Sequence, residues 1–171
     1  MVNSNKQQVA LDNIRDSLFH ALAHFSELQN SKEDPKHHHK WIILSVHHAA
    51  ELYLIALLKE VDPENKLLSK KVGTRSWYPS SSKTIVELKK MASSIKVSEN
   101  RLIEVIEDLI TARHNYMHNP SVDIHSLSSA IKSMLAIFRA ISLRYNISTE
   151  DIYNQYPPVE REVVEALDWK D

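Results

Sequence analysis

Apolar residues recur at steps of three and four along most of the chain, and strict alternation of apolar with polar residues is almost absent. Steps of three and four bring apolar side chains to one face of a helix, whereas alternation is typical of strands. The pattern predicts an all-α fold, an antiparallel bundle of about five helices followed by short helices at the C-terminal end. The clearest stripes consist of Leu11, Ile14, Leu18, Leu22 and Phe25 and of Leu127, Ile131, Met134, Phe138, Ile141 and Tyr145.

Prolines and capping residues divide this pattern into elements. The segment SKEDPK interrupts it after the first helix, and Pro63 and Pro120 follow the second and the fourth, because the residue before a proline avoids helical geometry. Ser98 is expected to cap the fourth helix and Asp123 the fifth. The helices are accordingly expected over about 7–29, 40–61, 81–93, 98–119 and 123–146, with a polar connection over 62–79.

The composition excludes several kinds of site. One glycine and no cysteine in 171 residues rule out glycine-rich phosphate loops, disulfides and cysteine zinc sites. We expect one helical bundle domain over residues 1–146 and an acidic helical extension over 147–171. No secretory signal pattern is present, and no uncharged apolar run approaches the roughly 20 residues of a membrane span. The expectation is a cytoplasmic protein without membrane contact.

Charge is distributed unevenly, although the formal net charge is only -1. Eight basic residues and one acid lie between residues 66 and 96, whereas the last 23 residues contain seven acids and two basic residues. Basic side chains beside aromatic rings suit RNA, so the basic segment is a candidate RNA contact, and a solvated surface is the alternative. The RNA-binding candidates are Lys70, Lys71, Arg75 and Trp77.

An arginine interrupts the apolar stripe of the fourth helix. The stripe that ends with Leu109 leads by a further step of four to Arg113, which falls within roughly 40° of the apolar side chains around the helix. A guanidinium stays protonated, so its burial requires a carboxylate, a phosphate or an interface. The alternative is that Arg113 extends along its stem to water at the end of the helix.

The second helix is apolar on nearly every side, which suits the middle of a fold. Its interior polar residues are His47, His48 and Glu51, which lie within about 100° of arc. A carboxylate in such a helix needs a cationic partner, and Arg113 is the other charge predicted to be buried. We therefore expect the second and fourth helices to pack with Glu51 near Arg113 or its adjacent histidines, the alternative being that Glu51 faces solvent.

The end of the fourth helix raises the question of a metal. His114 and His118 have the spacing of metal ligands on a helix, so they form a zinc site, a phosphate-binding rim or a pair of surface histidines. A mixed site that adds His48 and Glu51 is disfavoured, because carboxylate-bridged di-metal bundles use Glu-x-x-His, which the chain lacks. No metal and no cofactor is expected, and the His37–His39 tract, expected in a loop, is assigned no role.

The segment RHNYMH, residues 113–118, resembles the signature of the HEPN family (higher eukaryotes and prokaryotes nucleotide-binding domain), which is an arginine followed after four to six residues by a histidine. The match consists of Arg113 and His118. The segment HHAAELYLIALL in the second helix is similar to the family's acidic residue within an apolar helix, with Glu51 as the matching residue. The resemblance covers about residues 7–146.

The resemblance implies an all-helical domain that dimerises so that two motifs face one cleft, and that cleaves RNA without a metal. In that activity His118 accepts a proton and Arg113 stabilises the charge on phosphorus, which leaves a 2′,3′-cyclic phosphate. His114, Glu51 and His48 are the supporting residues. Such ribonucleases are toxins or phage-defence proteins, so an antitoxin or defence partner is expected beside the RNA substrate. The alternative is a noncatalytic HEPN module that binds a nucleotide, RNA or a partner protein.

One position departs from a subgroup of the family. In toxins that are silenced by a nucleotidyltransferase, a tyrosine two residues beyond the motif histidine accepts the modification. Here that position is Pro120. The resemblance therefore does not imply control by that route.

Overall fold

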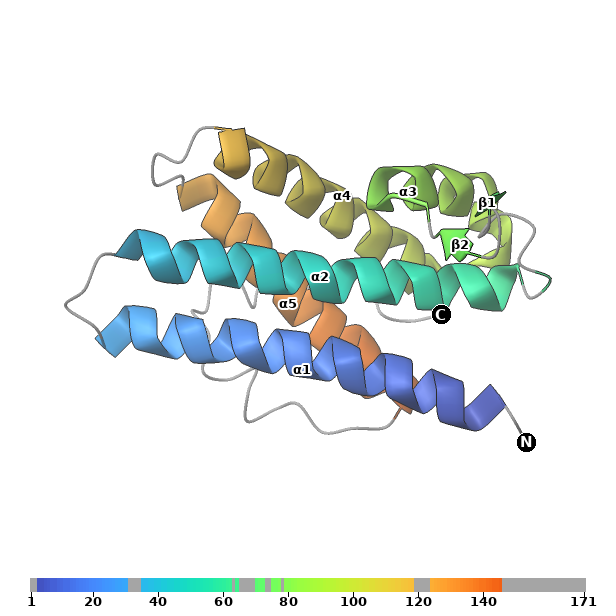
Figure 1. The fold of residues 1–171 in the computed structure, drawn as a ribbon, viewed down its shortest axis with the longest axis horizontal. Coiled ribbons are helices and arrows are strands. Elements are labelled where there is room, and N and C mark those ends of the chain that lie inside the picture. The colour runs from blue at the N-terminus through green and yellow to red at the C-terminus, as the bar shows by residue number, and fades with distance from the viewer. Residues whose placement is uncertain are drawn as a thin grey trace.

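The computed structural model describes residues 3–30, 35–62, 64, 70–72, 75–77, 79–118 and 124–145. Within these residues lie five α-helices, one 3₁₀ turn and a short antiparallel hairpin, and the predicted all-α bundle is confirmed (Figure 1). The elements are α1 (Asn3–Asn30), α2 (Pro35–Val61), β1 (Lys70–Val72), β2 (Arg75–Trp77), α3 (Ser81–Lys90), η1 (Ala92–Ser94), α4 (Val97–His118) and α5 (Ile124–Tyr145).

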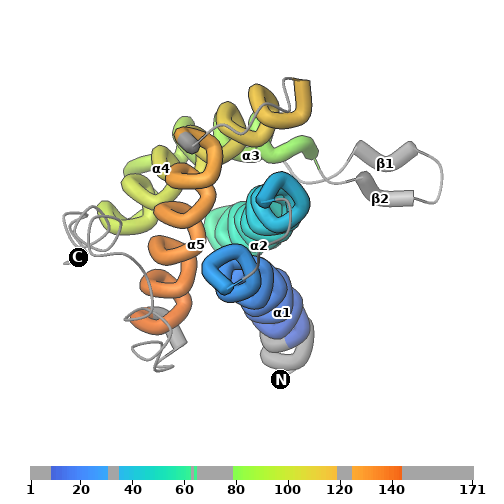
Figure 2. The backbone as a smooth tube through the Cα atoms, turned by 90° about the vertical axis from the view of Figure 1, so that its left-hand side faces the viewer, coloured from blue at the N-terminus to red at the C-terminus, as the bar shows by residue number. Residues whose placement is uncertain are grey.

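Helix α2 lies at the centre of the bundle. It contacts α1, α5, α4 and α3, and its contact with α1 is the most extensive. Figure 1 shows α1 and α2 side by side, with α5 crossing behind them. The view turned by 90° in Figure 2 shows α4 and α5 gathered on one side of α2 and α1 on another. A helix with neighbours in several directions must be apolar in several directions, which explains the composition of α2.

The core follows the predicted stripes. Ile42, Leu54 and Leu58 of α2 are fully buried, and burying a side chain of this size contributes roughly 1.5–3 kcal/mol. The other helices supply the facing surfaces. Their buried apolar residues include Leu11, Ile14, Leu18 and Phe25 of α1, Leu102, Ile106 and Leu109 of α4, and Ile131, Met134, Phe138 and Ile141 of α5.

Two helical segments, Pro35–Val61 and His125–Leu143, are long and apolar enough to cross a membrane by length and composition. The shares of their apolar windows that are buried inside the fold are 56% and 61%. Core helices of a bundle have the same properties, because they too are covered by neighbours on most sides. Length and composition therefore do not separate the two cases, and the cytoplasmic location stays a prediction.

Helix α2 begins at Pro35 rather than near Lys40, so the predicted boundary was wrong. Proline is tolerated at the first helical position, where the backbone N–H has no intrahelical acceptor. Pro35, which the sequence suggested was a helix breaker, is thus the first residue of α2. The expectation that the tract His37–His39 lies in a loop was also wrong: the tract is helical, and His38 and His39 are buried.

The polar connection contains a hairpin that the periodicity did not predict. Its pairs are Lys70 with Trp77, Lys71 with Ser76 and Val72 with Arg75. Strands of three residues are too short to show alternation, although a two-residue link that begins with glycine, Gly73-Thr74, is a frequent hairpin connection. All four RNA-binding candidates, Lys70, Lys71, Arg75 and Trp77, have their backbone on this hairpin, and their side chains lie outside what the structure describes.

The remaining boundaries differ from the predicted ones by a few residues. Helix α3 ends at Lys90 and is followed by the 3₁₀ turn, and α4 begins at Val97, so Ser98 lies in its first turn instead of capping it. Pro120 and Asp123 lie outside the described residues, as does the predicted acidic extension over 147–171 with its short helices.

Candidate functional site

The arginine that interrupts the stripe of α4 lies at the border between core and surface. Leu109, one turn before it, is fully buried, whereas Arg113 is partly buried. The Nε atom of Arg113 is buried, and among the described residues no atom accepts a hydrogen bond from it. A buried donor without an acceptor costs about 1–3 kcal/mol. This position therefore favours a ligand that brings acceptor oxygens.

Helix α2 brings a carboxylate and a histidine into the same region. His47 Nδ1 lies 3.7 Å from Glu51 Oε2, one turn further along the helix, and the positive charge of Arg113 acts on His47 from α4. Ser81, the first residue of α3, donates a hydrogen bond of 2.5 Å to Glu51 Oε1. The carboxylate is thus held by α3 and lies one helical turn from the histidine that interacts with the guanidinium.

The pKa of His47 is lowered. Burial is the largest cause, since it disfavours the charged imidazolium, and the positive charges of Arg113 and His48 act in the same direction, whereas Glu51 raises the pKa. The imidazole is therefore neutral at pH 7. Glu51 therefore faces a neutral imidazole, and its other carboxylate oxygen accepts the hydrogen bond from Ser81.

Two histidines lie on the outer side of the same end of α4. The ring centroids of His114 and His118 are 4.4 Å apart, with planes inclined at 53°, and both residues are exposed. Five positions place His118 roughly 140° around the helix from Arg113 and about 7.5 Å further along its axis. We call this set the α2–α4 polar face; it consists of His47, Glu51, Arg113, His114 and His118.

His48 lies beside this face and not within it. Its Nδ1 is 2.9 Å from Ser17 Oγ of α1, a hydrogen bond in which the donor depends on the tautomer. Sequence reasoning selected His48 and Glu51 as supporting residues, whereas His47 is the histidine whose environment is set by both Glu51 and Arg113. Neighbouring residues differ by about 100° around a helix, so only the packing of α2 against α4 distinguishes the two histidines.

An open pocket adjoins the polar face between α2 and α3. Its volume is about 270 Å³. The residues that line it are His48, Glu51, Leu52, Ile55, Pro79, Ser81 and Thr84. A lining that combines apolar side chains with a carboxylate, an imidazole and two hydroxyls suits a small ligand with hydrogen-bonding edges.

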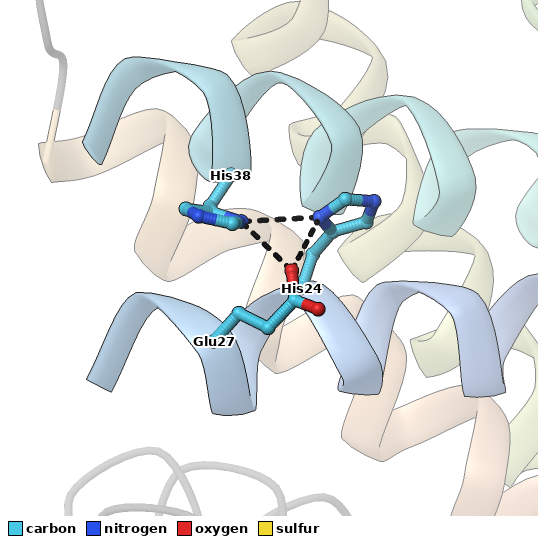
Figure 3. Close-up of side chains that lie close together, drawn as sticks. All are labelled: His24, Glu27 and His38. Carbon is cyan, nitrogen blue, oxygen red and sulfur yellow. Dashed lines mark hydrogen bonds and ion pairs between the residues drawn. The ribbon is translucent and has the colours of Figure 1, made fainter. Parts of the chain in front are cut away.

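A second group of titratable side chains lies between α1 and α2 (Figure 3). His24 and Glu27 come from α1 and His38 from α2, and the three side chains converge between the helices. The Nδ1 atoms of His24 and His38 are 3.1 Å apart. Glu27 Oε2 lies 3.6 Å from Nδ1 of His24 and 3.4 Å from Nδ1 of His38. We call these three residues the α1–α2 histidine cluster.

Aromatic rings surround the cluster. Trp41 stacks on the ring of His24, with centroids 6.1 Å apart and planes 13° apart, and the ring of His20 meets it edge-on at 4.7 Å. Nδ1 of His20 is in turn 2.7 Å from Ser45 Oγ. Burial lowers the pKa of His24, and the positive charge of His20 lowers it further. The His24 imidazole is therefore held in place and is neutral at pH 7.

Sequence reasoning missed this cluster. His20, His24 and Glu27 recur at steps of four and three along α1, which puts them on one face of that helix. That spacing is the signal that the sequence offers. A loop at 37–39 would leave His38 without a fixed place, whereas the helical tract brings His38 to this face.

The structure also bears on the metal sites considered from the sequence. Among the described residues, His24, Glu27 and His38 form a group of possible metal ligands. Their ligand atoms all lie within 4.8 Å of one another. The four residues of the mixed site considered above do not form such a group in the described part of the chain. They are His48, Glu51, His114 and His118.

Comparisons of the chain with protein-family models, with curated proteins and with solved structures give no match.

Proposed function

We propose that the protein is a metal-independent endoribonuclease of HEPN type, and that the α2–α4 polar face is its active site. The single observation that carries the proposal is the guanidinium of Arg113, which has a buried Nε donor without an acceptor among the described residues. Arg139 of α5 shares that feature. What distinguishes Arg113 is its place on one helix with two exposed imidazoles and its interaction with His47 of α2.

The chemistry assigns one role to each group of the motif. His118 removes the proton from the ribose 2′-hydroxyl, and the 2′-oxygen then forms a bond to phosphorus while the bond from phosphorus to the 5′-oxygen breaks. Arg113 donates hydrogen bonds to the phosphate oxygens, on which negative charge increases in the transition state. The products are a 2′,3′-cyclic phosphate and a 5′-hydroxyl.

The leaving 5′-oxygen also needs a proton. One histidine that has just accepted a proton on the attacking side does not reach the opposite side of phosphorus in the same step. A homodimer with two motifs in one cleft supplies the second histidine as the general acid. His114 and Glu51 position the catalytic pair, with His48 at the edge of the adjoining pocket.

Lys70, Lys71, Arg75 and Trp77 contact the RNA from the hairpin β1–β2, since basic and aromatic side chains together suit a backbone with stackable bases. We propose a cytoplasmic toxin or phage-defence ribonuclease, held in check by an antitoxin or a defence-system protein.

The test is cleavage of a mixed pool of cellular RNA by the purified protein in excess EDTA. The parent is expected to cut and to leave cyclic phosphate ends, whereas Arg113→Ala and His118→Ala cut at least about 100-fold more slowly, which is the usual effect of losing a general base or an oxyanion partner. Arg139→Ala is the matched control, because it removes a second arginine with a buried Nε from another helix. Unchanged cleavage in Arg113→Ala would overturn the proposed chemistry.

The pocket beside Glu51 favours a second candidate, a noncatalytic HEPN module that binds a nucleotide or RNA. This reading predicts saturable binding of RNA or a nucleotide, measured by fluorescence anisotropy, without any product. It also predicts that Leu52→Trp, which places a larger side chain in the pocket, weakens nucleotide binding. A catalytic face at the end of α4 predicts instead that Arg113→Ala affects RNA more strongly than Leu52→Trp does.

A further inference from the structure

The α1–α2 histidine cluster has the dimensions of a metal-binding site. Ligand atoms bound to zinc at about 2.0–2.1 Å in tetrahedral geometry are about 3.3–3.4 Å from one another. The three separations in the cluster are 3.1 Å between the two Nδ1 atoms and 3.6 and 3.4 Å from these atoms to Glu27 Oε2. All three edges of the triangle thus agree with that spacing to within about 0.3 Å.

The chemistry of the three groups points the same way. A neutral imidazole carries one proton, so when Nε2 of His24 and of His38 is protonated, both Nδ1 atoms present lone pairs to each other. A carboxylate oxygen adds further lone pairs to the same point. Without a cation, one Nδ1 must donate a proton to the other and the carboxylate competes for it. A divalent cation at the centre satisfies all three groups together.

The cluster is built on rigid elements and stays accessible. His38 lies in the first turns of α2 and is only 6% exposed, and the ring of His24 is fixed between Trp41 and His20. Glu27 has a side chain that is 60% exposed, so the cluster opens to solvent on that side. A cation therefore has an entry path to ligands that are already oriented.

We propose that His24, Glu27 and His38 form a binding site for a late first-row transition cation, with Zn²⁺ as the preferred occupant. Two imidazoles and one carboxylate are typical zinc ligands, whereas Ca²⁺ and Mg²⁺ prefer oxygen alone. Three protein ligands leave a fourth position for water or for an anionic group of a ligand. The cation ties α1 to α2, because it takes ligands from both helices.

The site shares no residue with the proposed ribonuclease face. Its ligands lie on α1 and at the start of α2, whereas Arg113 and His118 lie on α4. Helices α2 and α4 meet near the cluster, since Tyr116 of the motif donates a hydrogen bond of 3.2 Å to the backbone oxygen of Lys36. Cleavage of RNA in EDTA tests the α2–α4 polar face alone, and metal binding tests the cluster alone. Failure of one proposal leaves the other standing.

The experiment is calorimetric titration of tag-free, EDTA-treated and dialysed protein with Zn²⁺. One Zn²⁺ per chain is expected to bind. Glu27→Ala and His38→Gln are expected to weaken binding by more than about 100-fold, since even loss of a group that only orients a ligand costs about 10–100-fold. Glu27 is largely exposed, so its removal tests the site without placing the fold at risk.

Two control variants locate the cation. Glu104→Ala removes an exposed acid on α4. His118→Ala removes one member of the pair His114 and His118, which has metal-ligand spacing on the same helix. Both are expected to keep the parent's affinity for Zn²⁺. Loss of binding in His118→Ala with full binding in Glu27→Ala and His38→Gln would overturn the proposal in favour of a site on α4. Absence of saturable Zn²⁺ binding by the folded parent would also overturn it.

Co²⁺ provides a second measurement of the same site. A tetrahedral cobalt centre absorbs visible light far more strongly than the hydrated octahedral ion. The parent protein is expected to show that absorption after addition of one equivalent of Co²⁺ and to lose it when Zn²⁺ is added. The spectrum of the hydrated ion, unchanged in the presence of parent protein, would contradict a site with two imidazole ligands.

Discussion

The two polar regions of the bundle are built from similar residues but present opposite chemistry. Both include histidines and a glutamate, and both use a part of α2. In the α1–α2 histidine cluster, two imidazole nitrogens and a carboxylate oxygen converge within 3.6 Å of one another. In the α2–α4 polar face, the guanidinium of Arg113 has a buried Nε donor without an acceptor among the described residues, and the two imidazoles that follow it on α4 are open to solvent.

The difference shows that the kind of residue does not by itself decide what a polar region binds. Convergent lone pairs suit a cation, whereas N–H donors without acceptors suit an anion. Each histidine of α2 belongs to the region formed with the helix that packs against its side of α2. Helix α1 packs against one side of α2, and α4 packs against another. One helix therefore contributes to two polar regions whose exposed groups suit different kinds of ligand.

The largest expected effect is on the rate of RNA cleavage, which should depend on the α2–α4 polar face and not on the α1–α2 histidine cluster. Arg113→Ala is expected to reduce RNA cleavage in EDTA by at least about 100-fold, because the charge on the phosphate then has no guanidinium partner. His38→Gln is expected to leave that cleavage unchanged. Both rates are measured as the appearance of cyclic phosphate ends under identical conditions. A similar loss in the two variants would mean that the regions act as one site.

Zinc is expected to have the next largest effect, on stability. A ligand that binds only the folded state at a free concentration of 100 times its Kd stabilises by about 2.7 kcal/mol, which raises the Tm of a domain of this length by roughly 5–10 °C. Differential scanning fluorimetry with and without EDTA measures the shift. His38→Gln is expected to have the same Tm in both conditions, whereas Arg113→Ala is expected to keep the full shift.

A third prediction uses the energetic cost of the unused donor. Replacing Arg113 with methionine, which retains the apolar stem, removes a buried N–H that has no acceptor in the described part of the chain. The change is expected to stabilise the bundle by about 1 kcal/mol while cleavage is lost. Arg139→Met is the matched control, because its Nε is also buried and without an acceptor among the described residues. It is expected to gain stability at full activity. Urea unfolding measures both, and a destabilised Arg113→Met would indicate that the guanidinium already has partners.

The most gradual expected effect is that of pH on the EDTA-treated protein. The pKa values of His47 and His24 are lowered, in both cases mainly by burial. The groups that act on them are Glu51, Arg113 and His48 for His47, and His20, Glu27, His38 and His37 for His24. Neither histidine affects stability well above the unfolded pKa of about 6.5.

As the pH falls through that value, the unfolded chain binds protons that the folded protein does not yet bind, so stability decreases until the pH is below the lowered folded pKa values. Urea midpoints between pH 8 and pH 5.5 measure this decrease. A midpoint that rises as the pH falls over this interval would contradict the assignment of neutral histidines. His125→Gln, which replaces an exposed histidine of α5, is expected to follow the parent.

The helices of the bundle were predictable because their information is local. The stripe from Leu11 to Phe25 and the stripe along α5 repeat over many turns, and burial follows them closely. Two errors have different causes. A proline ends a helix in one context and begins one in another, which explains the wrong boundary at Pro35. The strands that flank Gly73-Thr74 in the sequence are too short to reveal their period, which explains the missed hairpin.

The polar regions were only partly predictable, because they depend on the rotation of one helix against another. Arg113 was identified from its place in a stripe on its own helix, and Glu51 from its apolar surroundings on α2. The choice between His47 and His48 required the packing of α2 against α4. The meeting of His24 with His38 required the register of α1 against α2, which no spacing within a single helix contains.

The contacts of α2 also bear on the order of folding. The most extensive helix contacts are α1 with α2 and α4 with α5, each between helices that are consecutive in the chain. Such local contacts cost little loop-closure entropy, so we expect two helical hairpins to form first and then to dock through α2. The histidine cluster lies within the first hairpin, whereas the polar face lies at the seam where the two hairpins meet. A nascent chain would therefore complete the proposed cation site before the proposed ribonuclease face is assembled, and any activity of that face would appear only after the two hairpins have docked.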